Sequence, residues 1–140
     1  MPDMLVKLYE LPPLGPIQQV MAADGVTIRP AKAPEKHLVL AWIAEHFSAA
    51  WASEVDVAFS RQPISCWVAV QENQILGFAC YEATVRNFFG PTGVHPDVRG
   101  RGIGKALFLE TLHAMKSLGY AYAVIGGAGP VGFYEKTVGA

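Results

Sequence analysis

One short run restricts the possible folds of this chain more than any other: the sequence RGRGIG at residues 99–104. Glycine adopts backbone conformations with positive φ that other residues avoid, so three alternating glycines indicate a tight turn. From Gly102 to Leu118, apolar residues recur at three- and four-residue intervals, which is the period of an amphipathic helix. The run therefore predicts a turn that opens directly into a helix.

The same turn has the composition of an anion site. The N–H groups of a glycine turn can converge on an anion, and the helix that follows adds the positive end of its dipole. Three of the eleven basic side chains lie here: Arg99, Arg101 and Lys105. A P-loop would need a hydroxyl at Ala106, and the dinucleotide pattern G-x-G-x-x-G would need a small residue at Leu107 or Lys105. Both patterns fail, whereas R-x-x-G-x-G fits.

Hydrophobic periodicity and turn residues predict the remaining elements. We expect strands at residues 26–29, 66–71, 75–83, 87–94 and 120–125, the last buried on both faces. Helices are expected from residue 33, from Ser53 to about Ser60 on a capping-box pattern, and over 131–137. This order predicts a mixed α/β protein of α+β-like type with helices on both faces of its sheet.

The N-terminal 25 residues contain four prolines and end in an Asp-Gly turn signal. We interpret residues 1–25 as an N-terminal extension, made of an extended segment and a Pro-rich loop, in front of one domain at 26–140. The charge is balanced, with 11 basic and 12 acidic side chains, which argues against a nucleic-acid partner. No signal-peptide pattern or membrane-length apolar run is present, so we expect a cytoplasmic protein with no membrane partner.

Two cysteines, Cys66 and Cys80, lie within apolar runs that have the character of strands. Isolated thiols in such runs are more often packing residues than reactive groups. We expect both to be buried, reduced and structural, and we expect no metal site.

Two motifs connect the glycine turn to a known family. Val94-His95-Pro96 stands before the turn, and Phe133-Tyr134-Glu135-Lys136 follows about thirty residues after it. With these motifs in this order, the chain resembles the GNAT-type N-acetyltransferases from about residue 26 to its end. The resemblance implies the GNAT fold, with a central mixed, mostly antiparallel sheet, and acetyl-CoA as the acetyl donor.

The resemblance also implies positions for the coenzyme. The strand before the turn would pair through its backbone with the pantetheine arm, because its glycines and Pro91 separate it from its neighbour. The implied coenzyme-binding residues are Thr92, Gly93 and Val94 beside pantetheine, and Arg99, Gly100, Arg101, Gly102, Ile103, Gly104 and Lys105 at the pyrophosphate.

The catalytic assignments rest on fewer residues. By resemblance, Tyr134 protonates the coenzyme thiolate, and the alternative is an aromatic residue packed in the core. A backbone N–H near Val94 is the natural group to polarise the thioester carbonyl. Glu82 is a candidate base because a carboxylate near apolar surface can have a raised pKa, although a solvated strand residue is the alternative. Weaker candidates are His95 and, for an amine pocket, Trp51, Glu54 and Asp56.

The sequence departs from the family pattern at two places. Gly127 stands where the family often has a coenzyme-binding Asn, and no final strand follows the last helix. We therefore expect a C-terminally incomplete domain. If the domain is instead complete, its sheet edge beside residues 120–125 is exposed or covered by another chain. The expected acceptor is a small-molecule amine or a peptide amino terminus, and a homodimer stays open. The alternative function is a non-catalytic CoA-binding regulatory or interaction domain.

Overall fold

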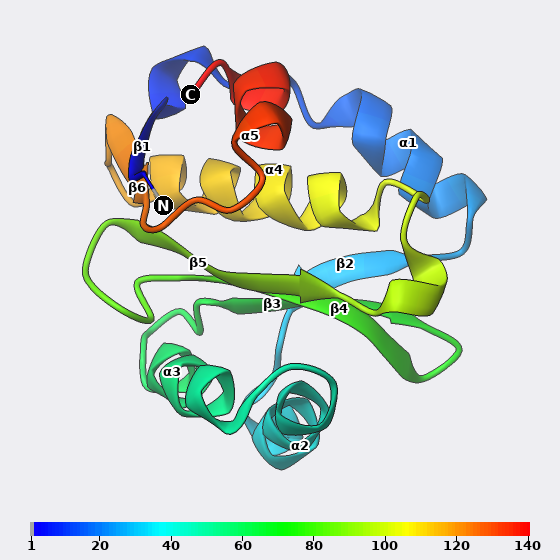
Figure 1. The fold of residues 1–140 in the computed structure, drawn as a ribbon. Helices are drawn as coiled ribbons and strands as arrows, with labels where there is room; N and C mark the ends of the chain where they lie inside the picture. Colours follow the sequence, from blue (N-terminus) through cyan, green and yellow to red (C-terminus); the bar gives the residue numbers. More distant parts are fainter. Residues whose placement is uncertain (1) are drawn as a thin grey trace.

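A single six-stranded sheet forms the centre of the computed structural model, which describes residues 2–140 (Figure 1). Its strand order is β1-β6-β5-β4-β3-β2, and all neighbours are antiparallel except β5 and β6, which are parallel. The strands are β1 (Met4–Lys7), β2 (Thr27–Pro30), β3 (Cys66–Gln71), β4 (Gln74–Tyr81), β5 (Phe88–Val94) and β6 (Tyr122–Ile125).

Helices cover both faces of this sheet. The helices are α1 (Gly15–Ala23), α2 (Lys36–His46), α3 (Ala49–Phe59), α4 (Ile103–Ser117) and α5 (Val131–Val138), with 3-10 turns η1 (Leu8–Glu10), η2 (Ala33–Glu35) and η3 (Pro96–Val98). In Figure 1, α1, α4 and α5 lie on one side of the sheet, and α2 and α3 lie on the other. The predicted fold class is confirmed, and each predicted strand agrees with the structure to within two residues.

Two apolar clusters hold these layers together. On one face, α4 buries Leu107, Phe108 and Leu112 against the sheet. On the other face, Ile43 of α2 and Val55 of α3 pack with residues of β3 and β4. The latter cluster includes Cys66 and Cys80, which stand opposite each other and are both buried free thiols, as expected.

The interpretation of residues 1–25 holds for the extended segment, which contains β1, but the Pro-rich loop is wrong. Residues 15–23 form α1, whose Ile17 and Met21 are buried and one helical turn apart. Pro16 lies in the first turn, where proline costs no hydrogen bond. The proline content of the segment suggested a loop, although this proline is compatible with a helix.

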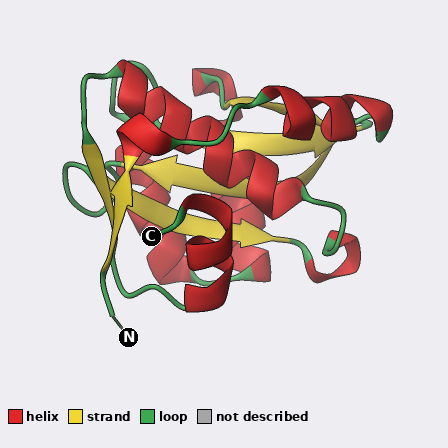
Figure 2. Ribbon diagram, turned by 90° about the horizontal axis from the view of Figure 1, so that it is seen from above, coloured by secondary structure: helices red, strands yellow, loops and turns green. Residues whose placement is uncertain are grey.

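The edge of β6 is not left without a partner. β1 pairs with it antiparallel, from Met4 opposite Ile125 to Lys7 opposite Tyr122. Figures 1 and 2 show these two strands side by side at one end of the sheet. No strand follows α5 among residues 2–140, and the N-terminal strand β1 supplies a pairing partner for β6 that the sequence analysis did not predict.

Two smaller predictions also need correction. α3 begins at Ala49, not at Ser53, because the hydroxyl of Ser48 accepts a hydrogen bond from the N–H of Trp51 at 3.1 Å and caps the helix. β6 is not buried on both faces, since Tyr122 is exposed while Ala123 and Ile125 are buried.

Candidate functional site

The parallel strands β5 and β6 separate after two residue pairs. Phe88 pairs with Val124 and Phe89 with Ile125, and no further pair follows. Gly90 has φ +116°, and the register between β4 and β5 shifts between Ala79 and Tyr81. From Gly90 to Val94, β5 therefore pairs with β4 alone, as its interrupted sequence indicated.

The open edge of β5 presents backbone groups of Val94. The next N–H, that of His95, donates to the carbonyl of Leu76 in β4 at 2.8 Å. Because backbone groups alternate in direction along a strand, the N–H and C=O of Val94 point away from β4. The Val94 carbonyl accepts a hydrogen bond from Nε of Arg99 at 3.2 Å, so its N–H is the group that faces the opening.

The glycine turn that follows β5 leaves a row of backbone donors free. Gly100 and Gly102 have φ of +85° and +84°, in the left-handed region that favours glycine. Among the described residues, the N–H groups of positions 100–105 have no acceptor, and the first paired N–H of α4 is that of Ala106, which donates to Gly102. Six successive free donors at a helix N-terminus are suited to an anion.

A cleft of about 610 Å³ lies beside these donors, between the N-terminal end of α4 and the start of α5. Arg99 and Lys105 supply positive charge to its walls, and none of its described lining residues is acidic. Val94, Val98, Pro130 and Phe133 provide its apolar surface. The combination fits a ligand with an anionic group and an apolar or amphipathic arm.

Arg101 is not part of this cleft. Its Nε donates to Oδ2 of Asp24 at 2.7 Å, and a terminal nitrogen donates to Oε1 of Gln71 at 3.0 Å. The side chain thus ties the glycine turn to the turn between α1 and β2. The sequence grouped Arg101 with the pyrophosphate residues, but the structure shows it engaged by other side chains.

Tyr134 lies close to the cleft without lining it. Its ring packs against Phe108 with centroids 5.1 Å apart, and burial raises the pKa of its phenol. The neighbouring Phe133 is the aromatic residue that lines the cleft. The F-Y-E-K motif predicted this helix, but it could not predict which of the two aromatic rings faces the cleft, because that depends on how α5 is rotated about its axis.

Glu82 is not brought together with the cleft residues. It follows the end of β4, where its N–H donates to the carbonyl of Phe88 at 2.8 Å, while the cleft lies at the opposite end of β5. Its carboxylate accepts a hydrogen bond from the hydroxyl of Tyr120 at 3.1 Å. The sequence pattern predicted that Glu82 lies on a strand, but it could not show that this position is at the end of the sheet away from the cleft.

The opposite face of β5 is covered by aromatic side chains. The ring of Phe47 lies against Gly93, and Trp51 stacks on Phe47 with centroids 5.4 Å apart. The ring of His95 packs against that of His46, with centroids 4.7 Å apart. Phe47 was not among the residues that the sequence analysis proposed for the site.

The other proposed acceptor residues serve structural contacts. Glu54 accepts a hydrogen bond from Thr84 at 2.8 Å, and Asp56 pairs with Lys36 at 2.6 Å. The N–H of Gly127 donates to Oδ1 of Asp3 at 2.9 Å, so this backbone donor is already occupied.

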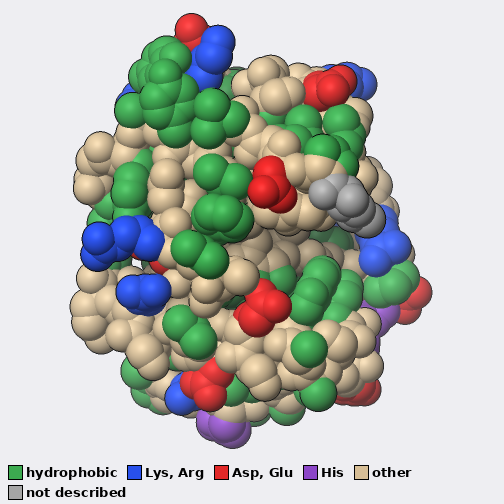
Figure 3. All heavy atoms as spheres, turned by 60° about the vertical axis from the view of Figure 1, so that its left-hand side comes forward, with side chains coloured by type: hydrophobic (Ala, Val, Ile, Leu, Met, Phe, Trp, Pro, Cys, Tyr) green, Lys and Arg blue, Asp and Glu red, His purple; other side chains and the backbone are tan. Residues whose placement is uncertain are grey.

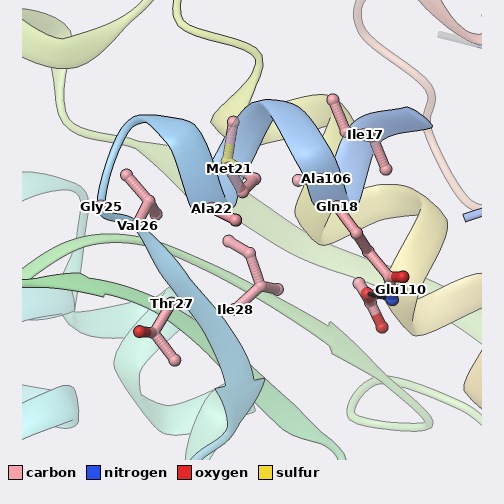
Figure 4. Close-up of a pocket in the computed structure, with 10 residues that line it drawn as sticks. All are labelled: Ile17, Gln18, Met21, Ala22, Gly25, Val26, Thr27, Ile28, Ala106 and Glu110. Atoms are coloured by element: carbon pink, nitrogen blue, oxygen red, sulfur yellow. Dashed lines mark hydrogen bonds between the residues drawn. The ribbon is translucent and has the colours of Figure 1, made fainter. Parts of the chain in front are cut away.

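A second cleft, of about 390 Å³, lies between α1, β2 and α4 (Figure 4). Its surface is mainly apolar, with Ile17, Met21 and Ile28, and Nε2 of Gln18 donates to Oε1 of Glu110 at 2.8 Å. A carboxylate repels an anion, and none of its described lining residues is a cation. This cleft is therefore unsuited to a phosphate.

Charge is dispersed on the face that Figure 3 shows. Positive and negative side chains are interspersed there, and hydrophobic side chains form several separate patches. Within residues 2–140, the structure contains no group of three side chains placed to hold a metal ion. None of the helices in this described part is long and apolar enough to cross a membrane.

Comparison with known proteins gives one match to a family. The profile of the acetyltransferase (GNAT) domain matches residues 62–137, which include the opened strand, the glycine turn and nearly all of α5. No curated protein matches the sequence.

Solved structures share the fold at low identity. The chain is similar to the glucosamine N-acetyltransferase region of a fungal multi-domain beta-N-acetylglucosaminidase, with a TM-score of 0.80 and 17% identity over 97% of this chain and 19% of that one. An N-acetyltransferase from Sphaerobacter thermophilus gives a TM-score of 0.71 and 18% identity over 96% of this chain and 46% of that one. A GNAT acetyltransferase from Brucella melitensis, solved in complex with acetyl-CoA, gives a TM-score of 0.57 and 20% identity over 79% of this chain and 80% of that one. This chain thus spans less than half of the first two.

Proposed function

Because this chain belongs to the GNAT acetyltransferase family, we propose that it transfers an acetyl group from acetyl-CoA to the amine of a small molecule or a peptide amino terminus. The observation that carries the proposal is the continuity of the opened strand and the glycine turn. The free edge of β5 leads directly into six unpaired N–H groups at the N-terminus of α4. These groups lie beside a cleft whose walls include the basic side chains of Arg99 and Lys105.

The residues present fit a coenzyme that has a pyrophosphate and a pantetheine arm. The N–H groups of positions 100–105, with Arg99 and Lys105, would hold the pyrophosphate. The backbone of Thr92, Gly93 and Val94 borders the gap that the arm would enter. Arg101 would act indirectly, because its pairing with Asp24 holds the turn in place.

Two groups of this chain have chemical tasks in the proposal. Acetyl-CoA supplies a thioester, so that a C–S bond is exchanged for an amide C–N bond. The N–H of Val94 would stabilise the negative charge that develops on the carbonyl oxygen. Tyr134 would donate the proton that the departing thiolate needs, and its raised pKa keeps the phenol protonated at neutral pH. The proton that the amine loses as the amide forms would pass to solvent, from which the phenolate would recover its own. Glu82 receives no role, because it lies at the other end of β5.

The proposal is tested by binding and turnover of the full chain. Acetyl-CoA and CoA should raise the melting temperature, NADH should not, and free thiol should appear when an amine from a panel of small amines and short peptides is added. Absence of stabilisation by both acetyl-CoA and CoA would contradict the proposed site.

One observation favours the second candidate, a domain that binds the coenzyme without catalysis. Tyr134 is packed against Phe108 and does not line the cleft, as expected for a core residue. Stabilisation by acetyl-CoA together with no thiol release from any amine would support this candidate.

A further inference from the structure

A cleft at the other end of α4 has the composition of a second ligand site. It has a volume of about 430 Å³, within the range of small-molecule sites, and three segments of the chain form its walls. We call it the arginine cleft, and its principal residues are Arg61, Ser65, Glu82, Arg86, Leu118 and Tyr120.

This cleft is separate from the proposed coenzyme site. The two sets of lining residues have no member in common. The coenzyme cleft contains Ile103 at the start of α4, whereas Leu118 follows its last residue. Since α4 has 15 residues, the two ends are about 22 Å apart. A ligand in the arginine cleft would therefore not be the coenzyme.

The two arginines of this cleft retain free donors. Arg61 uses Nε for the carbonyl of Glu82 at 3.1 Å, which leaves its terminal nitrogens available. Arg86 is exposed and has no hydrogen bond or ion pair with any of residues 2–140. Burial and the hydrogen bond to Glu82 raise the pKa of Tyr120, while Arg86 and Arg61 act to lower it.

A buried hydroxyl in the wall also lacks a partner. Ser65 is 1% exposed, and its Oγ makes no hydrogen bond to a described residue. Buried polar groups are nearly always paired, so Ser65 is an exception in the wall of this cleft.

The charges define the kind of ligand. The arginine cleft presents two guanidinium groups and one carboxylate, so it offers partners for both a negative and a positive group on one ligand. A guanidinium binds a carboxylate through paired hydrogen bonds, and Glu82 has a second carboxylate oxygen free to accept from an ammonium group. We propose that the arginine cleft binds a small molecule with one carboxylate and an adjacent ammonium group, as in an amino acid.

The proposal can be tested by NMR titration of the full chain without acetyl-CoA, so that its outcome is independent of acetyl transfer. Glycine should shift the amide signals of residues 60–62, 64–65, 82–87 and 118–120, N-acetylglycine should shift them with lower affinity, and glycinamide should not. No shift with either carboxylate, equal binding of glycinamide, or tighter binding of inorganic phosphate would overturn it.

Two variants sharpen the test. Arg86→Gln removes a side chain that makes no hydrogen bond or ion pair with residues 2–140, so the fold should be kept, and it should weaken glycine binding about tenfold. Lys116→Gln is the matched control, because Lys116 is also exposed but lies outside the cleft. Unchanged binding in Arg86→Gln, or equal weakening in both variants, would overturn the proposal.

Discussion

The ring of Phe47 lies so close to Gly93 that a Cβ at position 93 would be 2.7 Å from its Cε1 atom. This contact joins the end of α2 to the strand that borders the proposed coenzyme gap. Position 93 is therefore restricted by its neighbour and not by backbone conformation, since its φ is not in the left-handed region.

We expect Gly93→Ala to displace either Phe47 or β5 and to weaken acetyl-CoA binding, with a loss of about 1–3 kcal/mol in the free energy of unfolding. Urea denaturation and calorimetric titration with acetyl-CoA measure the two effects. In a double variant, Phe47→Leu added to Gly93→Ala should restore part of the acetyl-CoA affinity and part of the free energy of unfolding. Gly15→Ala is the control, because a Cβ at Gly15 meets no other atom within 4 Å. Equal behaviour of the two alanine variants would contradict the argument.

The glycines of the turn should differ in their tolerance to alanine. Gly102 has φ +84°, where an alanine costs about 1–2 kcal/mol, so Gly102→Ala should redirect the free N–H groups and raise the Kd for acetyl-CoA about tenfold. Gly104 has an ordinary helical φ, and a Cβ there would be at normal contact distance, 3.5 Å, from Val94. Gly104→Ala should therefore bind acetyl-CoA nearly as the parent does. Equal loss of affinity in both variants would show that the backbone conformation is not the cause.

The sequence predicted what depends on local pattern. The apolar period of residues 102–118 located α4, and the glycines before it located the turn, because both signals lie within one segment. Helix α1 was missed although Ile17 and Met21 have helical spacing, since the prolines around them are typical of a loop.

What the sequence did not predict depends on contacts between distant segments. Pairing of β1 with β6 joins residues more than a hundred positions apart, and neither strand contains a signal for the other. The same holds for the ion pair of Arg101 with Asp24, which engages a side chain that the family resemblance assigned to the pyrophosphate. Likewise, only the rotation of α5 decides that Phe133, and not Tyr134, lines the cleft.

Tyr134→Phe should separate the two candidate functions. If the phenol protonates the leaving thiolate, its loss should lower kcat about a hundredfold with little change in the KM for acetyl-CoA. Because burial raises the pKa of this phenol above its usual value of about 10, the proton is retained at all lower pH. The parent enzyme should thus show no loss of kcat from this group until the pH exceeds about 10.

Phe133→Leu provides the comparison for that variant. Phe133 lines the cleft, so its change should raise the KM for acetyl-CoA while kcat stays close to that of the parent. A Tyr134→Phe enzyme with unchanged kcat would remove Tyr134 from the mechanism and leave it as a packing residue.

The pair formed by Arg29 and Glu35 should make stability depend on acidity. Two hydrogen bonds of 2.8 Å join the side chains, and Arg29 lowers the pKa of Glu35 to about 2. A lowered pKa in the folded state gives stability that is complete above the unfolded value, about 4.3, and is lost as the pH falls towards 2. Since water reaches the pair, we expect it to contribute about 1 kcal/mol to the free energy of unfolding.

Urea denaturation at pH 7 and pH 3 of the parent and of Glu35→Gln tests this pair. The variant should be less stable by about 1 kcal/mol at pH 7, and the difference should shrink at pH 3. Glu10→Gln is the control, because Glu10 is exposed and forms no recorded ion pair within residues 2–140. A difference that does not change between the two pH values would exclude the ion pair as its source.

The N-terminal strand offers the sharpest test of how residues 1–25 relate to the rest of the chain. Val6 and Leu5 are neighbours in β1, but Val6 is fully buried against the core while Leu5 is 53% exposed. An aspartate at Val6 would place a charge in the apolar interior, so Val6→Asp should lower the free energy of unfolding by roughly 3 kcal/mol or more. Leu5→Asp adds the same charge on the solvent side and should change it by about 0.5 kcal/mol or less. If urea denaturation gave two small and equal effects, β1 would be an extension that the domain does not need. The expected large difference would instead make β1 an integral strand of the sheet, because alternation along a strand alone distinguishes the two positions.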